Sequence, residues 1–340
     1  MHGKTGIAIF FFHMTRTTGN KIYKDYAGEL IDEIYEEISV STSWDFENGL
    51  AGIGWGIEYL VQNGFIEADT DEVLKEFDNR LFQALIYNTP REIGLLDGLV
   101  GMGAYFLKRI QNPASNNEKI STLTNKQTLI HLIDELDKRT QDVSVIIREP
   151  QTFDICWDYP ILLWFLGEIF KQNLFNFKVE KIIERLIEPL NDDKSLPKLH
   201  NNRLLLALAV IKLSNCRIDR QQTKETIDTS INLNIVSNKL LTSIYRNTIT
   251  NKLTPNSVFI ANGTLGIVCI YKQLFALTKE FHFKTEMEYW ANQSFSFEEV
   301  DKGFAGFDFM NEENTFGLLE GLAGIGLYNN TILQYDNLTL

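Results

Sequence analysis

The chain is poor in the residues that mark several common protein classes. Of its 340 residues only 3 are cysteine and 7 are proline, and no cysteine forms a CxxC or CxH pair. This scarcity disfavours a disulfide framework and an ordinary structural zinc site. Scarce proline, together with the lack of a long Ser/Gly-rich stretch, argues against disordered segments and flexible linkers.

Positive charge and long apolar runs are also scarce. The 32 Lys and Arg residues are outnumbered by 45 Asp and Glu residues, which gives a formal charge of −13. Like charges repel, so nucleic acid and anionic membranes are disfavoured as partners. No run approaches the roughly 20 apolar residues of a membrane span. The short run 6–12 ends at His13 and lacks a small-residue cleavage site, so we expect a buried helix there and a cytoplasmic protein without membrane insertion.

A glycine motif recurs along the whole chain. Its closest copies share the pattern polar-Gly-x-x-Gly-x-Gly, as in ENGLAGIG from Glu47. Five copies are recognisable on sight, and they begin at His2, Glu47, Leu96, Ala261 and Leu319. Two degenerate copies fill the gaps, at 157–163 and 200–206. A period of about 45 to 60 residues indicates a two-helix unit with loops.

Buried and amphipathic segments alternate along this repeat. Stretches that are apolar nearly all round indicate helices buried on both sides, and they cover residues 53–61, 102–110, 161–170, 204–213 and 267–277. Segments with apolar residues at helical spacing lie between them, at 23–38, 70–85, 127–136, 179–190 and 219–245. Almost nothing alternates with period two. The sequence therefore predicts an all-α fold.

The alternation predicts an inner ring of seven buried helices inside an outer ring of about six to seven. Glycines at the inner helix starts would allow sharp turns and close backbone approach. A flat helical solenoid gives the same alternation, but it needs polar capping repeats at both ends. Here the first copy begins at residue 2 and is strongly apolar. We therefore expect one closed domain over residues 1–340, with the outer helix that should precede the first copy missing.

The residue before the first glycine position is polar in every copy. These residues are His2, Asn48, Asp97, Asp158, Asn201, Asn262 and Glu320. One interpretation is structural, because Asn and Asp cap helix N-termini and Glu is favourable at the positive helix end. In a closed ring, however, the helix starts converge on one mouth. The same residues then line a polar pocket in which helix N-termini offer N–H groups to anions.

Further polar and aromatic side chains lie beside these positions. They are Glu47, Trp157, Tyr159 and His200. Aromatic rings beside carboxylates suit peptide or sugar binding, although a protein core and its rim contain the same residues. The carboxylates of Asp97, Asp158 and Glu320 can do acid–base work if two of them lie close together with separated pKa values.

The repeated polar-Gly-x-x-Gly-Ile-Gly opening resembles the lanthionine synthetase C-like (LanC-like) family. The segment FGLLEGLAGIG at 316–326 resembles the final repeat of that family. The resemblance spans the chain and implies an α/α toroid with seven inner and seven outer helices. Family enzymes add peptide cysteine thiols to dehydrated Ser or Thr residues, and a zinc ion activates the thiolate.

The zinc ligands that the resemblance implies are missing here. The family takes them from a Trp-Cys-x-Gly-like motif in the fifth copy and a Cys-His-Gly motif in the sixth, and the matching positions are His200, Ala261 and Asn262. Neither Ala nor Asn is a plausible zinc ligand in this place, and one histidine cannot hold the ion. We therefore expect no zinc. The family's catalytic histidine aligns with Asp158, so Asp158 and His200 are the catalytic candidates.

Three functions remain open. The favoured one is a zinc-free relative of lanthipeptide cyclases that binds a peptide in the mouth of the toroid, as a partner of a modification enzyme or transporter. The second is an active thioether-forming enzyme, without a metal or with zinc held by unexpected residues such as His2 and His200. The third is a carbohydrate-active enzyme that uses two carboxylates among Asp97, Asp158 and Glu320.

Overall fold

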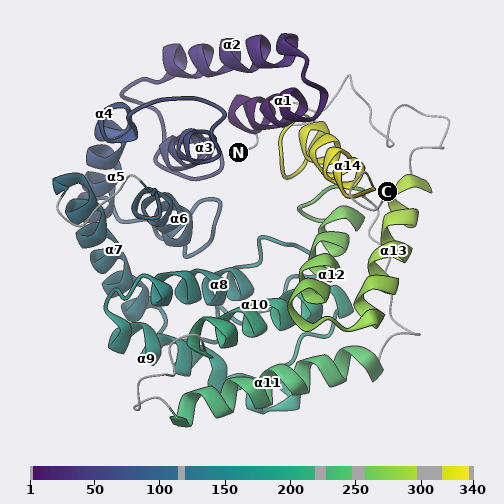
Figure 1. Ribbon diagram of the computed structural model, residues 1–340. Helices are drawn as coiled ribbons and strands as arrows, with labels where there is room; N and C mark the ends of the chain where they lie inside the picture. Colours follow the sequence, from purple (N-terminus) through teal and green to yellow (C-terminus); the bar gives the residue numbers. More distant parts are fainter. Residues whose placement is uncertain (1–2, 114–118, 219–226, 247–256, 297–315, 337–340) are drawn as a thin grey trace. The chain divides into compact units, whose positions relative to one another are not determined.

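The computed structural model describes residues 3–113, 119–218, 227–246, 257–296 and 316–336 (Figure 1). Within these ranges the regular structure is helical and contains no strand. The α-helices are α1 (Lys4–Thr18), α2 (Lys21–Glu37), α3 (Leu50–Gln62), α4 (Thr70–Val73), α5 (Lys75–Tyr87), α6 (Leu99–Ile110), α7 (Ile120–Arg139), α8 (Asp158–Lys171), α9 (Asn176–Ile187), α10 (His200–Ile218), α11 (Ile227–Arg246), α12 (Thr264–Thr278), α13 (Phe281–Ser296) and α14 (Leu322–Asp336). Two short 3₁₀ turns follow α9, at Glu188–Asn191 and Asp193–Ser195.

The alternation of buried and amphipathic helices is confirmed. The five apolar stretches are α3, α6, α8, α10 and α12, and run 6–12 lies in α1. The amphipathic segment 70–85 is divided at Leu74, so it forms α4 and α5 instead of one helix. Residues 219–226 of the last predicted segment lie outside the described ranges. No described helix is long and apolar enough to cross a membrane.

Helix α13 was not predicted from the sequence. Its aromatic residues lie on both the buried and the exposed side of the helix. Phe283 and Trp290 are fully buried, while Phe281 and Tyr289 are exposed. Large apolar side chains on two faces obscure the helical period that marks an amphipathic segment.

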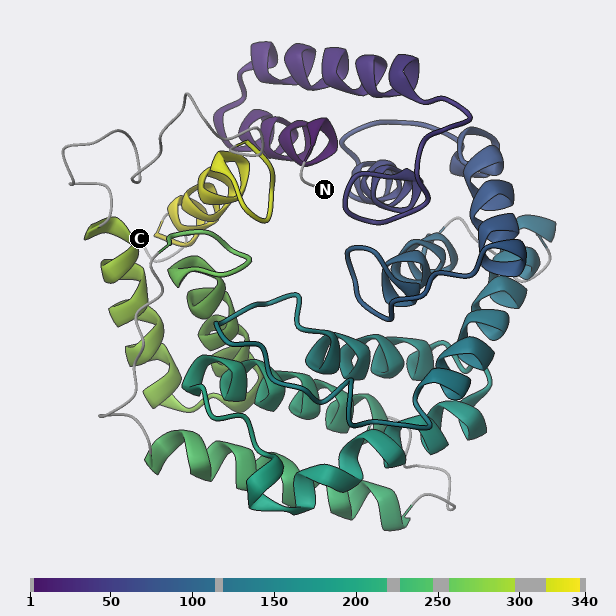
Figure 2. The same cartoon turned by 180° about the vertical axis from the view of Figure 1, so that it is seen from behind.

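The structure divides into two compact units. Unit 1 comprises residues 1–77 and 255–340, and unit 2 comprises residues 78–254. In unit 2, α8 packs against α6, α9 and α10, while α7 packs against α6 and α9. In unit 1, α12 packs against α13, and α1 packs against α2, α3 and α14 (Figures 1 and 2). Because the helices of the first and last copies are in contact, an open solenoid with those copies at opposite ends is excluded.

Glycines let the buried helices approach one another closely. A Cβ atom on Gly103 of α6 would lie 2.4 Å from the ring of Phe165 on α8. A Cβ atom on Gly326 of α14 would lie 2.5 Å from the ring of Phe10 on α1. The third glycine of these two copies is therefore a contact point between helices, as the repeat pattern predicts.

A buried ion pair ties three helices of unit 2 together. Arg109 of α6 is 1% exposed, and its Nη2 lies 3.0 Å from Asp78 Oδ2 on α5. Tyr105 donates its hydroxyl to Asp78 Oδ1 at 2.6 Å, and Asn125 of α7 donates to Asp78 Oδ2 at 3.4 Å. Since its carboxylate is saturated with donors, the buried charge of Asp78 is tolerated.

Four buried helices begin in the same way, after what we call fold-back loops. These loops are residues 43–49, 92–98, 257–263 and 316–321, before α3, α6, α12 and α14. At α3 the N–H groups of Leu50, Ala51 and Gly52 donate to the carbonyls seven residues earlier, at 2.8, 3.4 and 3.4 Å. The same three bonds occur at α6 and α12, and two of them are seen at α14. The main chain itself therefore satisfies donors that a helix leaves unpaired at its N-terminus.

The first glycine of each of these copies is required by the fold-back loop. A Cβ atom on Gly98 would lie 2.3 Å from the backbone nitrogen of Gly94 and 2.5 Å from the carbonyl carbon of Ile93. Gly49, Gly263 and Gly321 face similar contacts with loop backbone, the nearest at 2.3–2.5 Å. The predicted close backbone approach is confirmed, and its cause is contact with the loop because these glycines are not in the left-handed region.

Substituting Gly98 tests this requirement. We expect Gly98→Ala to lower the free energy of unfolding by about 2–3 kcal/mol, because a backbone contact cannot be relieved by a rotamer change. Gly28→Ala is the matched control, since nothing lies within 4 Å of a Cβ at this position in α2. The control should change stability by under about 1 kcal/mol, in the stabilising direction. Equal losses in the two variants, measured by urea denaturation, would refute the explanation.

Candidate functional site

The polar residues before the first glycines do not cap their helices. The N-cap residues of α3, α6 and α12 are Gly49, Gly98 and Gly263, and none of these caps has a side-chain hydrogen bond. The interpretation of Asn48, Asp97 and Asn262 as helix caps is therefore wrong. The predicted anion sites at these helix starts are wrong as well, because the carbonyls of the fold-back loops already accept from the N–H groups.

These polar side chains lie mainly at the surface. Asn48, Asp97 and Asn262 are exposed, and Glu320 is half-buried. Asn262 accepts a hydrogen bond from the Ser257 hydroxyl at 2.7 Å across its own loop. The carbonyls of the loop accept the hydrogen bonds from the first N–H groups of the helix. The side chain before the first glycine can therefore make other contacts. His2, the corresponding residue of the first copy, lies outside the described residues.

Two predicted carboxylates meet at the start of α8 in unit 2. A Cβ atom on Gly94 would lie 2.6 Å from Asp158 Oδ1 and 3.5 Å from Asp97 Oδ1, so both carboxylates lie against the same glycine. Asp97 belongs to the fold-back loop before α6, and Asp158 is the first residue of α8. The contact between α6 and α8 therefore brings together side chains that are 61 positions apart in sequence (158 − 97).

The surroundings of Asp158 favour its protonated form. Burial is the largest cause, and together with the nearby carboxylates of Asp97, Glu92 and Asp154, in that order, it raises the pKa of Asp158 to about 6. The start of α8 would favour the ionised form, but burial and like charges prevail. A carboxyl group with this pKa can accept and release a proton close to neutral pH.

Two members of this acidic cluster were not found from the sequence. We define the acidic cluster as Glu92, Asp97, Asp154 and Asp158. Glu92 opens the fold-back loop before α6, a position that has no chemical meaning until the loop is seen. Asp154 lies four residues before Asp158, and it accepts a hydrogen bond from the N–H of Cys156 at 2.8 Å. Burial also raises the pKa of Asp154.

The aromatic residues beside Asp158 are part of the core of unit 2. Trp157 is 6% exposed and donates its indole N–H to the carbonyl of Arg148 at 3.0 Å. Tyr159 is 1% exposed and donates its hydroxyl to the carbonyl of Leu186 at 2.5 Å. We therefore assign Trp157 and Tyr159 to positioning Asp158, not to contacting a ligand.

The start of α10 binds a carboxylate that the chain itself supplies. Glu149 accepts hydrogen bonds from the N–H groups of Lys198 and Leu199 at 2.7 and 2.8 Å, and from Asn202 Nδ2 at 3.2 Å. His200 and Asn201, two predicted site residues, are 4% and 5% exposed there. Glu149 was missed because it lies about 50 residues from its partners and in no motif.

The residues at the positions where the resemblance places zinc ligands do not have the chemistry to hold a zinc ion. Ala261 has no ligand atom, and its N–H donates to the carbonyl of Leu319 at 2.9 Å. The side-chain oxygen of Asn262 accepts a hydrogen bond from the Ser257 hydroxyl. His200 is left as the one imidazole at these positions, which cannot hold the ion alone. Among the described residues, no three His, Cys, Asp or Glu side chains are grouped so as to hold a metal.

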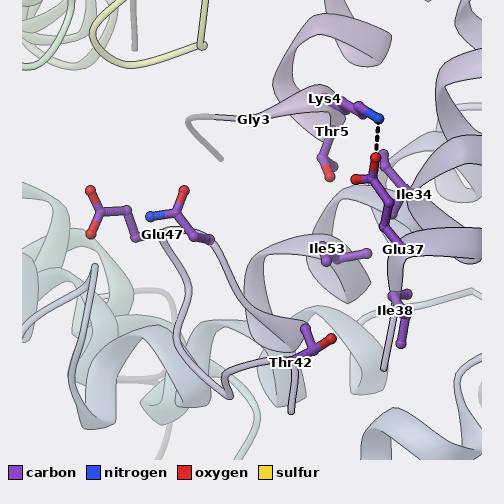
Figure 3. A pocket seen from close by; sticks show the side chains of 10 residues that line it. Gly3, Lys4, Thr5, Ile34, Glu37, Ile38, Thr42, Glu47 and Ile53 are labelled. Atoms are coloured by element: carbon purple, nitrogen blue, oxygen red, sulfur yellow. Dashed lines mark hydrogen bonds and ion pairs between the residues drawn. The ribbon is translucent and has the colours of Figure 1, made fainter. Parts of the chain in front are cut away.

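Glu47 and Asn48 line a pocket in unit 1 (Figure 3). Its volume is about 280 Å³, and the start of α1, the end of α2 and the residues around the start of α3 surround it. Two residues predicted to bind a ligand therefore share a cavity, whereas the acidic cluster lies in unit 2.

Comparisons with known proteins give a family match over the first part of the chain and a likeness of fold over nearly all of it. Residues 1–145 match the model of the family described as lanthionine synthetase C-like protein. Nine chains of solved structures match, among them nisin cyclase, with a TM-score of 0.65 and 15% sequence identity over 97% of this chain and 87% of that chain. A comparison with curated proteins finds no match. The likeness to nisin cyclase shows the fold, which is all-α and of the α/α toroid type that the repeat predicts, and residues 1–145 resemble the lanthionine synthetase C-like family.

Proposed function

We propose that this chain binds a peptide without zinc, through the acidic cluster of unit 2. In this role it serves as a non-catalytic partner of a peptide-modification enzyme or transporter. Two findings support a peptide ligand. Residues 1–145 match the model of the lanthionine synthetase C-like family, and nisin cyclase, whose name gives a peptide substrate, has the same fold.

The observation that carries the proposal is the raised pKa of Asp158. Three further carboxylates surround this half-buried group, and each of them makes its ionisation less favourable. Carboxylates that repel one another lower the stability of the fold. Groups whose pKa is raised in this way are typical of sites that bind a ligand or take part in a reaction. A cationic group of a peptide would relieve the repulsion when it binds.

The replaced zinc ligands support binding over the family's cyclisation. Thiolate activation needs an ion or a base that lowers the thiol pKa. Ala261 supplies no ligand, and no described residue replaces it. Cys216 is buried and Cys269 is half-buried, and burial raises the pKa of both thiols, so neither is prepared as a nucleophile of its own.

A second candidate function follows from the same carboxyl group. In a peptide-modifying enzyme without metal, Asp158 would accept or donate a proton with a pKa near the working pH. A free cysteine thiol has a pKa of about 8.5. Proton transfer from this thiol to Asp158 is therefore uphill by roughly 2–3 pKa units. This difference makes catalysis without zinc the weaker of the two candidates.

Peptide binding is tested by selection from a random peptide display library on the immobilised protein. We expect enrichment of basic peptides that compete for one site. The double variant Asp97→Asn/Asp158→Asn should bind them at least about tenfold more weakly, because the cationic groups lose their carboxylate partners. The exposed Asp142→Asn serves as the control and should bind normally. Peptides that bind the double variant as tightly as the wild type would count against this site.

Metal content separates the two candidate functions from a zinc-dependent cyclase. Mass spectrometry of the untagged protein, purified with and without added zinc, should show no stoichiometric zinc, because the donor set at 200, 261 and 262 cannot hold the ion. Stoichiometric zinc that is lost in His200→Ala would overturn the zinc-free proposal. It would restore metal-assisted thiolate attack as the leading mechanism.

The raised pKa of Asp158 also predicts a pH-dependent stability. The folded pKa of about 6 exceeds the ordinary aspartate value of 3.8, so the folded state holds the proton of Asp158 more tightly between these values. The unfolding free energy therefore falls as pH rises from about 4 to above 6. Asp158→Asn should raise the Tm at pH 7.5 by about 2 °C, with no gain below about pH 4.

Circular dichroism melts across this pH range measure the effect. The control is Asp142→Asn. Hydrogen bonds from Ser144 lower the pKa of Asp142, so replacing this carboxylate should not raise the Tm. A gain for Asp158→Asn that is independent of pH would show that packing, not ionisation, is the cause.

A further inference from the structure

We infer that the start of α10 is a carboxylate site, that Glu149 occupies it in the free protein, and that the C-terminal residue of the bound peptide takes its place. The class of ligand rests on the proposed peptide binding. The site lies in unit 2, like the acidic cluster, but other residues form it and it takes a group of the opposite charge.

The start of α10 holds a carboxylate by three hydrogen bonds. Glu149 accepts from the N–H groups of Lys198 and Leu199 and from Asn202 Nδ2, at 2.7, 2.8 and 3.2 Å. Both carboxylate oxygens take part, Oε2 with Lys198 and Oε1 with the other two donors. N–H groups at the positive end of a helix are suited to an anion. The geometry at this helix start is therefore that of a carboxylate site.

Glu149 leaves two buried acceptors at this place without a donor. The side-chain oxygens of Asn201 and Asn202 are buried and accept no hydrogen bond within the described part of the chain. The two residues are 5% and 0% exposed. Asn202 points into the site, because the nitrogen of the same amide donates to Glu149. A buried acceptor without a donor lowers stability, and an ionised carboxylate has no N–H or O–H to offer.

The C-terminal residue of a peptide carries both groups that the site can bind. Its carboxylate replaces that of Glu149 at the two N–H groups. Its main-chain N–H is attached to the carbon next to this carboxylate, so it reaches an asparagine oxygen in the first turn of α10. An aspartate or glutamate side chain holds its carboxylate further from the main-chain N–H. The compact arrangement therefore favours a chain end over an acidic side chain.

Positive charge prevails in the sequence around the site. Residues 194–203 contain three Lys or Arg residues and no Asp or Glu, in a chain with a net charge of −13. Arg203 donates through Nε and Nη2 to the carbonyl of Pro197, at 3.0 and 2.6 Å, which fixes its guanidinium at the helix start. Burial lowers the pKa of Arg203, and the Glu149 carboxylate opposes this effect. A carboxylate that displaces Glu149 therefore meets the same favourable charge.

The segment that carries Glu149 also borders the acidic cluster. Glu149 and Asp154 both lie in the connection between α7 and α8, outside any α-helix, so Glu149 can move without disturbing one. The carbonyl of the neighbouring Arg148 accepts the indole N–H of Trp157, which precedes Asp158. The carboxylate site and the acidic cluster are thus joined through one connection, which suits two subsites for a single peptide.

Three small probes test the site by NMR on the isotope-labelled full chain. N-acetylglycine has the carboxylate and the N–H of a C-terminal residue. N-acetylglycinamide lacks the carboxylate, and levulinate has a methylene group in place of the N–H. N-acetylglycine should shift the amide resonances of Lys198 and Leu199. It should bind at least about tenfold more tightly than N-acetylglycinamide and about fivefold more tightly than levulinate.

Variants of Glu149 identify the internal competitor. Glu149→Ala should bind N-acetylglycine at least about tenfold more tightly than the wild type, because a competitor on the same chain is removed. Glu149→Gln keeps the size of the side chain and should bind the probe about threefold more tightly, since a neutral amide competes less well. Glu184→Ala, which removes an exposed carboxylate of α9 in the same unit, should bind like the wild type.

A purely structural role for Glu149 predicts other results. Failure of both Glu149 variants to bind N-acetylglycine, or equal affinity of wild type and variants, would overturn the inference. Equal affinity for the three probes would overturn it as well. So would unchanged Lys198 and Leu199 resonances in the wild type at about a hundred times the Kd of Glu149→Ala. If Glu149→Ala does not fold, Glu149→Gln provides the same comparison.

The outcomes also separate this inference from the proposed function. If library peptides bind through the acidic cluster while the Glu149 variants do not bind N-acetylglycine, the carboxylate site fails and peptide binding stands. If N-acetylglycine binds as expected but the library yields no peptide, the proposed function fails and the start of α10 stands as a carboxylate site.

Discussion

Hydrogen bonds from the first N–H groups of the buried helices to carbonyls seven residues earlier determine how this protein is built. Each net bond contributes only about 1 kcal/mol, but a buried donor left without a partner costs more. The fold-back loop satisfies up to three of these donors at once, and it does so four times in the described residues. It leaves no room for a Cβ at its last residue, which explains why the first glycine recurs.

Rigid supports hold the acidic cluster in place. Asp78 accepts from Tyr105, Arg109 and Asn125, so α5, α6 and α7 are joined, and α6 is the helix that follows the loop carrying Asp97. Trp157 and Tyr159 fix the first turn of α8 through bonds to backbone carbonyls. The repulsion among the carboxylates is thus opposed by packing and buried hydrogen bonds, which keeps the two aspartates together at neutral pH.

Periodicity and repeat spacing were enough to predict most helices, because a buried helix is apolar all round and its outer neighbour is apolar on one side. The same rules missed α13, where Phe281 and Trp290 face opposite environments. Polar positions such as Asp97 were found, but their role as caps was not correct, since a main-chain cap has no side-chain signature. Glu149 could not be found, because its partners at 198 and 199 are joined to it only by the tertiary fold. The sequence therefore predicts which positions matter better than it predicts what they contact.

The main-chain caps have an evolutionary consequence. When a side chain caps a helix, the choice of residue is restricted to a few short polar types, and replacing it weakens the helix. At a fold-back loop the position before the glycine is released from that restriction. Its side chain can change from a metal ligand to an amide or a carboxylate while the helix start keeps its bonds. Natural selection can thus exchange the chemistry of such positions at little loss of stability, so one scaffold can host proteins with different activities.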